Sequence, residues 1–303
     1  VSDCSRADVG RCYLGNKVDR KLLDEVRQKL AKIDVRSVSM SQESIAEAMM
    51  GKKQWWTPFP KVRYTERPDA ATACVMEGDI VVLVDNSPAA MILPTHFFDF
   101  VQEANDFYFP PLIGTYLRIL RIVVFLLTMF ITPVWFLLVK DPSRTQAGLE
   151  FLAIDSHYSV PLLVQLLLAE FIVDLLKLAS LNTPDVFSNS FSMLGALVLG
   201  DFAVQAHWLV PEVLAYMAFV AIANFAQPSY ELGYAFKLCR MMILILTAIF
   251  NLWGFIAGLV ITALLISFNK TVSGRCYLYP LIPFNGRALT SLMLRKPITK
   301  SKN

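Results

Sequence analysis

The sequence predicts an α+β protein in which a soluble N-terminal α/β domain precedes a multi-pass α-helical transmembrane domain. Of its 303 residues, 55% are hydrophobic, and the mean hydropathy of +0.49 is high for a soluble protein. The 17% of charged residues is nevertheless too many for a bundle of membrane helices alone, and these charges concentrate in roughly the first hundred and the last thirty residues. We therefore expect a soluble domain at 1–105, a helical membrane domain at 106–268 and a basic tail at 269–303.

The first half of the soluble domain is expected to contain a strand and two helices. Residues 8–14 are the candidate strand. Residues 19–33 predict an amphipathic helix because apolar side chains recur at helical spacing, namely Leu22, Leu23, Val26, Leu30 and Ile33. Residues 39–42 resemble a capping box for a second helix, which continues to Met50 and ends at Gly51.

The second half of the soluble domain predicts a short helix followed by a hairpin. Pro68 suits the first turn of a helix that Gly78 would end. Residues 79–84 are too apolar for a strand exposed on both faces, residues 85–88 have turn chemistry, and 89–93 form the returning strand. We expect these strands to belong to a small mixed sheet.

Five segments are expected in the membrane domain: 116–139, 160–181, 191–209, 211–228 and 238–268. The clearest apolar run, Ile122–Val139, follows Arg118 and Arg121 and closes at Lys140, as expected for anchors at two interfaces. A bilayer core about 30 Å thick requires roughly 20 apolar residues of helix. A buried helix of a large soluble protein is the alternative for one such run, but several runs follow one another.

The orientation of the chain depends on how many segments cross fully. The basic tail fits a cytoplasmic end, with Arg295, Lys296, Lys300 and Lys302. If both ends are cytoplasmic, the number of crossings is even, and 160–181 is then a partial or interfacial element. Five full crossings would put the tail outside. Residues 228–231 are expected to break the membrane region, and Gly254 and Gly258 offer a packing face or a kink in 238–268.

Ionisable residues in the membrane domain are the candidate functional residues. Glu170, Asp174 and Lys177 share one face of the 160–181 helix. Charges at membrane depth normally face a bundle interior or a water-filled path, so Glu170 and Asp174 are the first candidates for an ion path. An amphipathic interfacial helix, or an internal Asp174–Lys177 pair, is the alternative interpretation.

Asp201 and Glu231 are weaker candidates for the same path. Either carboxylate could instead be a structural partner of Lys177, Lys237 or Arg240.

Composition argues against several other classes of function. A net charge of +3 is too small to indicate nucleic-acid binding. The three histidines are far apart, and no metal-ligand spacing, nucleophile elbow, P-loop or dinucleotide fingerprint is present, so we expect no enzyme, metal or cofactor. The five cysteines suggest free thiols in a reducing compartment. Because the chain starts at Val1, we also expect that an N-terminal part of the natural protein precedes it.

Several motifs, in order along nearly the whole chain, resemble the A-subunit family of spore germinant receptors (the GerA family). They are Glu66-Arg67-Pro68-Asp69, Met76-Glu77-Gly78-Asp79-Ile80, Leu83-Val84-Asp85-Asn86-Ser87-Pro88, and the Asn105–Tyr108 junction. Within that family, the stage V sporulation protein AF branch is the most similar, through residues 108–118, 174–180, 228–232 and 280–286. Asn86 stands where the family often has Gly, and Asn tolerates the same turn.

The resemblance implies a multi-pass protein of the inner spore membrane with a cytoplasmic N-terminal domain. It further implies a homo-oligomeric, ligand-gated cation channel that releases monovalent ions early in germination, with other membrane proteins of the germination machinery as partners. A non-conducting scaffold that couples the soluble domain to a membrane partner is the alternative. The Glu66–Asp69 motif, with Asp85 and Pro88, is either an interface or a requirement of the fold.

Overall fold

The computed structural model describes most of the chain in two compact units. The described residues are 8–33, 41–50, 57–103, 106, 108–141, 152, 154, 158–182 and 200–294. One unit, here the soluble unit, comprises Val1–Leu120 and Ala263–Asn303. The other, the helical unit, comprises Arg121–Thr262. Residues 39 and 40 of the expected capping box lie outside the described residues. Residue 51, where the second helix was expected to end, also lies outside them.

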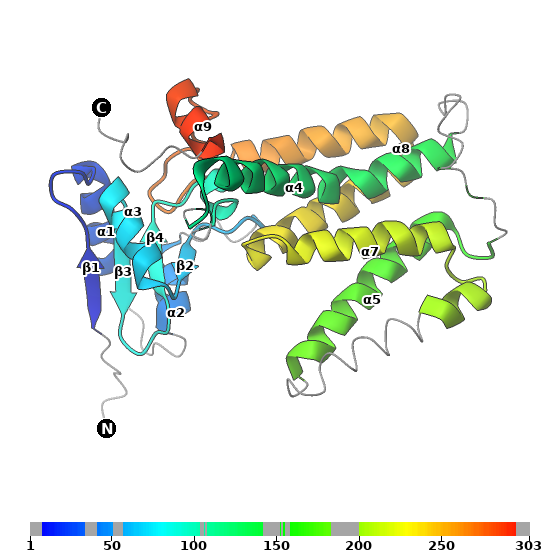
Figure 1. Cartoon of the computed structure of the whole chain (residues 1–303), viewed down its shortest axis with the longest axis horizontal. Helices are drawn as coiled ribbons and strands as arrows, with labels where there is room; N and C mark the ends of the chain where they lie inside the picture. The colour runs from blue at the N-terminus through cyan, green and yellow to red at the C-terminus, as the bar shows by residue number, and fades with distance from the viewer. Residues whose placement is uncertain are drawn as a thin grey trace. The chain divides into compact units, whose positions relative to one another are not determined.

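The soluble unit is built on a four-stranded sheet (Figure 1). Its strands are β1 (Val9–Cys12), β2 (Arg63–Thr65), β3 (Ile80–Val84) and β4 (Ala90–Leu93), in the order β1-β3-β4-β2. All three pairings are antiparallel, so the expectation of a mixed sheet was wrong. The β3–β4 hairpin was predicted, and Asn86 in its turn has a φ of 57°, a left-handed conformation that Asn tolerates. β2 was not predicted, because three residues give too short a pattern.

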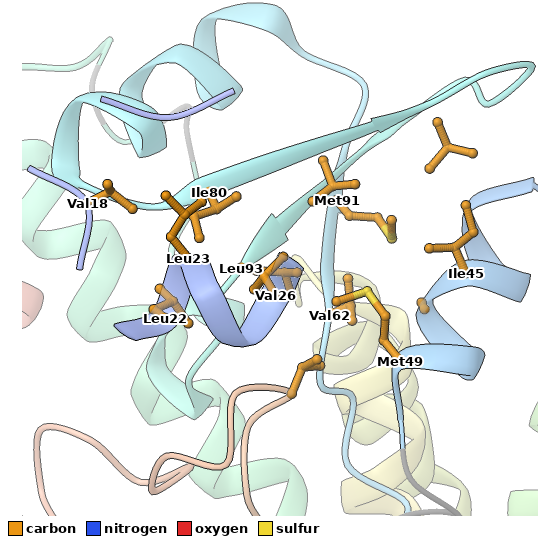
Figure 2. Close-up of a cluster of buried hydrophobic side chains, with 14 residues drawn as sticks. Val18, Leu22, Leu23, Val26, Ile45, Met49, Val62, Ile80, Met91 and Leu93 are labelled. Carbon is orange, nitrogen blue, oxygen red and sulfur yellow. The ribbon is translucent and has the colours of Figure 1, made fainter. Parts of the chain in front are cut away.

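Helices cover both faces of this sheet. α1 (Arg20–Ala31) and α2 (Ser41–Met49) pack on one face, and α3 (Pro68–Glu77) packs on the other. Alternate strand residues divide between the faces, since side chains of a strand point to opposite sides. Ile80, Val82 and Met91 join the core with α1 and α2 that Figure 2 shows, whereas Val81 and Ile92 contact α3.

The C-terminal segment completes the soluble unit. Val272 is 1% exposed and belongs to the same core as α1 and α2. The Tyr277 hydroxyl donates a 2.7 Å hydrogen bond to the Pro60 carbonyl. Residues 272 and 277, which fall in the range expected as a basic tail, thus pack with the first part of the chain. A short helix, α9 (Gly286–Met293), follows.

The described part of the helical unit contains four long helices. They are α4 (Pro111–Lys140), which begins in the soluble unit, α5 (Leu162–Asn182), α7 (Pro211–Phe225) and α8 (Tyr230–Ser267). Among the described residues, α4 and α8 are long and apolar enough to cross a membrane. α4, α5 and α7 correspond to the expected segments 116–139, 160–181 and 211–228. Of the expected 191–209 segment, residues 191–199 lie outside the described residues and 200–205 are helical.

α8 reverses direction in its middle, so the region expected as one segment at 238–268, with a packing face or a kink at its glycines, consists of two arms. Asn251 has φ 53° and ψ −131°, far from helical values. A Cβ atom on Gly254 would lie 1.8 Å from the carbonyl oxygen of Leu246, although eight residues of continuous helix would separate the two by about 12 Å. The two arms, 230–250 and 252–267, are drawn in gold and orange in Figure 1. The expected break before this element lies at 226–229, between α7 and α8.

Candidate functional site

Four charged side chains form a cluster between α5 and α8. Glu170 and Asp174 lie one turn apart on α5, and Lys237 and Arg240 lie one turn apart on α8. Residues three or four positions apart share a face of a helix, so each helix presents a matched pair of like charges to the other. The cluster contains two carboxylates and two cations and is neutral overall.

The Glu170 carboxylate is the centre of the cluster. Its Oε1 atom accepts a 2.8 Å hydrogen bond from Arg240 Nε and a second, shorter one from Nη2. Lys237 Nζ lies 3.2 Å from Glu170 Oε2 and also pairs with Asp174 Oδ2. Arg240 Nη1 donates to the backbone carbonyl of Thr128 on α4, at 2.7 Å. The cluster thus connects three helices.

The cluster is buried, apart from Asp174. Glu170 is 2% exposed, Lys237 6% and Arg240 1%, whereas the Asp174 side chain is 33% exposed. Desolvating an ion is expensive, and a buried pair offsets that cost only when hydrogen bonds satisfy both partners. The contacts of Glu170 meet this condition, but removing one partner would leave an uncompensated buried charge.

Of the other predicted membrane-domain residues, Lys177 borders this cluster, and its charge interacts with those of Asp174 and Lys237. Lys177 was a pairing candidate, and its ammonium group lies 5.2 Å from the ring centroid of Phe225 and 5.5 Å from that of Tyr234. Asp201 and Glu231 are exposed. Arg240 was one of three pairing candidates for these two carboxylates, and in the structure it forms an ion pair with Glu170.

The Glu66–Asp69 motif starts α3 and connects it to the segment that leads into α4. Pro68 occupies the first turn of α3, where a missing backbone N–H costs nothing. Arg67 forms a 2.7 Å ion pair with Asp69, and the Tyr108 hydroxyl hydrogen-bonds with both side chains. The Arg67 guanidinium, followed by the Tyr108 hydroxyl, holds the pKa of Asp69 well below its usual range.

The same motif borders a groove on the α3 side of the sheet. The groove has a volume of about 440 Å³, and Glu66, Pro68, Leu83 and Pro88 are among its lining residues. Asp85, the other predicted motif residue, accepts a 3.0 Å hydrogen bond from the backbone N–H of Asn86 in the hairpin turn. Asp85 therefore has a local role in the turn.

The soluble unit also contains an acidic pocket that the sequence did not predict. It has a volume of about 70 Å³, and its charged lining residues are Arg63, Glu77, Asp79, Asp99 and Glu103. Arg63 donates to the Asp99 backbone carbonyl at 3.0 Å rather than to a carboxylate. Burial, then the charges of Asp99 and Glu77, raises the pKa of Asp79 to about 7. The only sequence signal was the Glu77-Gly78-Asp79 spacing at a helix end.

The acidic pocket does not have the geometry of a metal site. Among the described residues, no group of three or more His, Cys, Asp or Glu side chains could hold a metal ion.

Comparison with known proteins identifies relatives of the whole chain. A family model described as "Bacillus/Clostridium GerA spore germination protein" matches residues 1–303. The chain is 34% identical over 295 residues to stage V sporulation protein AF of Bacillus subtilis, covering 97% of this chain and 59% of that protein. It is 30% identical over 296 residues to spore germination protein KA of the same organism, covering 97% and 54%. The chain thus spans just over half the length of these relatives. No solved structure matches it.

Proposed function

The chain belongs to the Bacillus/Clostridium GerA family of spore germination proteins, and from this membership we propose that it is a multi-pass membrane subunit of a spore germination complex. We further propose that the complex resides in the inner spore membrane, with the soluble unit and the C-terminal segment in the cytoplasm. An oligomer of such subunits, together with other membrane proteins of the germination machinery, would carry monovalent cations across that membrane.

The observation that supports a membrane location is the distribution of polarity in the helical unit. Its charged cluster is buried, whereas large apolar side chains are exposed, among them Phe171 at 63%, Ile222 at 71% and Trp253 at 76%. Large exposed apolar surfaces are uncommon on water-soluble monomers and mark contact with lipid or with other proteins. Membrane domains keep ionisable groups inside and apolar groups toward lipid.

The positions of the carboxylates refine the proposed cation path. Glu170 is neutralised by Arg240 and Lys237, so its charge is already balanced, and we assign it to holding α5 against α8. Asp201 and Glu231 are exposed, and Asp174, which shares Lys237 with the buried Glu170, is 33% exposed. These three are the carboxylates proposed to line the path between subunits. Carboxylates along a pore raise the local concentration of cations and disfavour anions.

A non-conducting scaffold is the second candidate function, and the charge balance of the buried cluster favours it. A neutral cluster that connects α4, α5 and α8 supplies rigidity without offering a site for a mobile ion. The Arg67–Asp69–Tyr108 contacts, which join α3 to the entrance of α4, would then transmit the state of the soluble domain to a membrane partner.

Potassium-ion flux through proteoliposomes distinguishes the two functions. The vesicles would hold the full chain with its co-purified partners, as wild type and as the Asp174→Asn/Asp201→Asn/Glu231→Gln variant. The channel proposal expects the variant to lose at least about tenfold in flux with unchanged assembly. Glu25→Gln, an exposed substitution on α1, is the matched control and should leave flux unchanged. No flux from correctly assembled wild-type complex would favour the scaffold.

A further inference from the structure

We propose that α8 enters and leaves the bilayer on the same side, as a helical hairpin whose tip contacts lipid at the opposite interface. The tip is formed by Ile249, Phe250 and Trp253, on either side of Asn251. This proposal rests on the membrane location proposed above. It adds the side that each end of α8 faces and the surface that meets the lipid headgroup region.

Contacts between the two arms establish the hairpin geometry. A Cβ atom on Gly258 would lie 3.0 Å from the side chain of Ile243, and the Cys239 thiol and Thr262 share a side-chain hydrogen bond. The three contacts thus join Gly254 to Leu246, Gly258 to Ile243 and Thr262 to Cys239. These pairs lie progressively further from Asn251 on both sides. Only two antiparallel arms in close contact give this pattern.

The lengths of the arms match the thickness of a bilayer, whereas one continuous helix would not. At 1.5 Å per residue, the arms 230–250 and 252–267 are about 31 and 24 Å long, and the hydrocarbon core is about 30 Å thick. A straight helix of 38 residues would be about 57 Å long, nearly twice that thickness. Each arm therefore suits a separate passage through most of the core.

The composition of the tip fits the interface between lipid and water. Ile249, Phe250 and Trp253 are 63%, 60% and 76% exposed, and such a cluster is costly in water. Trp is enriched at headgroup level, and Lys at a helix end is an interfacial anchor. Lys140, the last residue of α4, donates a hydrogen bond to the Ala248 carbonyl next to the tip. The exit of α4 and the tip of α8 thus lie at one interface.

The second arm has no charged residue to keep it out of lipid. Residues 252–267 contain only apolar, small and hydroxyl side chains besides the glycines. Their exposed members include Ile256, Val260 and Leu264. After Ser267 the chain continues into residues 269–279, which belong to the soluble unit. Both ends of α8 are therefore assigned to the side of the membrane that holds this C-terminal segment.

Thiol labelling in proteoliposomes tests the proposed sidedness. Full-length variants would carry Tyr230→Cys, Trp253→Cys or Phe268→Cys, with the native cysteines replaced by serine except Cys12, an exposed residue of β1. Cys12 reports the orientation of each molecule, and the probe is a membrane-impermeant maleimide. Cysteines at 230 and 268 should label together with Cys12, and the cysteine at 253 only in the oppositely oriented fraction.

Opposite labelling of positions 230 and 268 would overturn the hairpin and leave the membrane location intact. Equal labelling of all three positions from one side, in a chain that does not float with the vesicles, would overturn the proposed membrane function itself. The two failures are therefore distinguishable.

Fluorescence quenching gives a second readout that needs no cysteine replacement. The emission difference between wild type and Trp253→Phe reports Trp253 alone. Lipids brominated near the headgroup should quench it at least about twofold more than lipids brominated near the chain ends. Stronger quenching from the chain ends would place Trp253 at the bilayer centre, where a single tilted span through 230–267 would put it, and would overturn the proposal.

Discussion

At the scale of single residues, Glu170 is held by two cations that come from another helix. Replacing it with Gln would leave Arg240 and Lys237 buried with only Asp174 as a counter-charge. Breaking a buried ion pair by removing one partner costs about 3–5 kcal/mol. We therefore expect Glu170→Gln to lower the free energy of unfolding by that amount, measured by thermal or denaturant unfolding of the full chain in detergent micelles.

The control for this prediction is Asp201→Asn, which removes an exposed carboxylate and should change stability by less than about 0.5 kcal/mol. The double variant Glu170→Gln/Arg240→Gln should be less destabilised than the sum of its single changes, because it removes both partners. Equal stability of Glu170→Gln and wild type would contradict the cluster's structural role.

Asp79 makes a second residue-scale prediction, on pH. Its pKa is raised to about 7 by burial and by Asp99 and Glu77, with Arg63 acting in the opposite direction. Between pH 3.8, the pKa of Asp79 in the unfolded chain, and about pH 7, its pKa in the folded chain, the Asp79 carboxyl is protonated only in the folded state. The free energy of unfolding therefore falls as the pH rises through this range. We expect the soluble unit to lose up to about 4 kcal/mol between pH 4 and pH 8.

Hydrogen exchange of β3 amides in the full chain, corrected for the intrinsic pH dependence of exchange, measures this loss. Asp79→Asn should abolish most of the pH dependence and stabilise the unit at pH 8. The outcome that would refute the interpretation is a pH profile that this substitution leaves unchanged. Asp24→Asn, an exposed change on α1, serves as the control.

The sequence could predict the residue-scale site only in part. Helical spacing placed Glu170 and Asp174 on one face, and burial of that face followed from the cost of charge in lipid. The partner helix could not be predicted, because Arg240 lies 70 positions away from Glu170 and hydropathy does not report tertiary pairing. The environment of Asp79 could not be predicted for the same reason, because the neighbouring carboxylate of Asp99 comes from a different element.

At the scale of elements, Gly254 decides whether α8 can fold back. A Cβ atom there would meet a backbone carbonyl at 1.8 Å, and backbone cannot move aside as a flexible side chain can. We expect Gly254→Ala to separate the arms and to destabilise the helical unit by about 3 kcal/mol, the upper end of the usual range for overpacking, measured by unfolding in detergent. Gly200→Ala is the matched control, because nothing lies within 4 Å of that position, and it should be neutral or slightly stabilising.

The reversal of α8 was beyond prediction from hydropathy. Both arms are apolar, so the average over a window passes smoothly through Asn251. The sequence contained the signals, a polar Asn followed by Gly254 and Gly258 in a long apolar run, but the same residues also fit a packing face or a mild kink. In contrast, the strands and helices of the soluble unit were mostly predicted, since turn residues and alternation mark their ends.

At the scale of the whole molecule, the end of the chain stabilises its beginning. Tyr277 is fully buried and hydrogen-bonds to Pro60, and Arg275 pairs with Asp19 at the start of α1. We expect Tyr277→Ala to cost about 3–5 kcal/mol and to increase hydrogen exchange in the 57–65 region and in α1. Phe284→Ala, which changes a side chain that is 74% exposed in the same segment, should leave exchange there unchanged. Equal protection of these amides from exchange in the Tyr277→Ala and Phe284→Ala variants would contradict this prediction.

The fold class of the molecule could be predicted in part from the distribution of charge and hydropathy along the sequence. Charge and hydropathy divide the sequence into a mixed sheet-and-helix part and an apolar helical part, which the structure also contains. The basic composition of the last residues suggested a separate tail, but composition does not reveal that Val272 and Tyr277 are core residues. A distant segment that adds only one or two apolar side chains to a core has no periodic hydrophobic pattern in its sequence.

The placement of Val272 in the soluble core has a consequence for biosynthesis. The last strand of the sheet ends at Leu93, so the ribosome has made the rest of that core long before Val272 emerges. At 5–20 residues per second, translation of the intervening residues takes roughly ten to thirty-five seconds. Throughout this interval the nascent domain lacks one of its core residues, while the apolar helices of the helical unit are being translated. The domain can therefore complete its core only after the helical region has been translated.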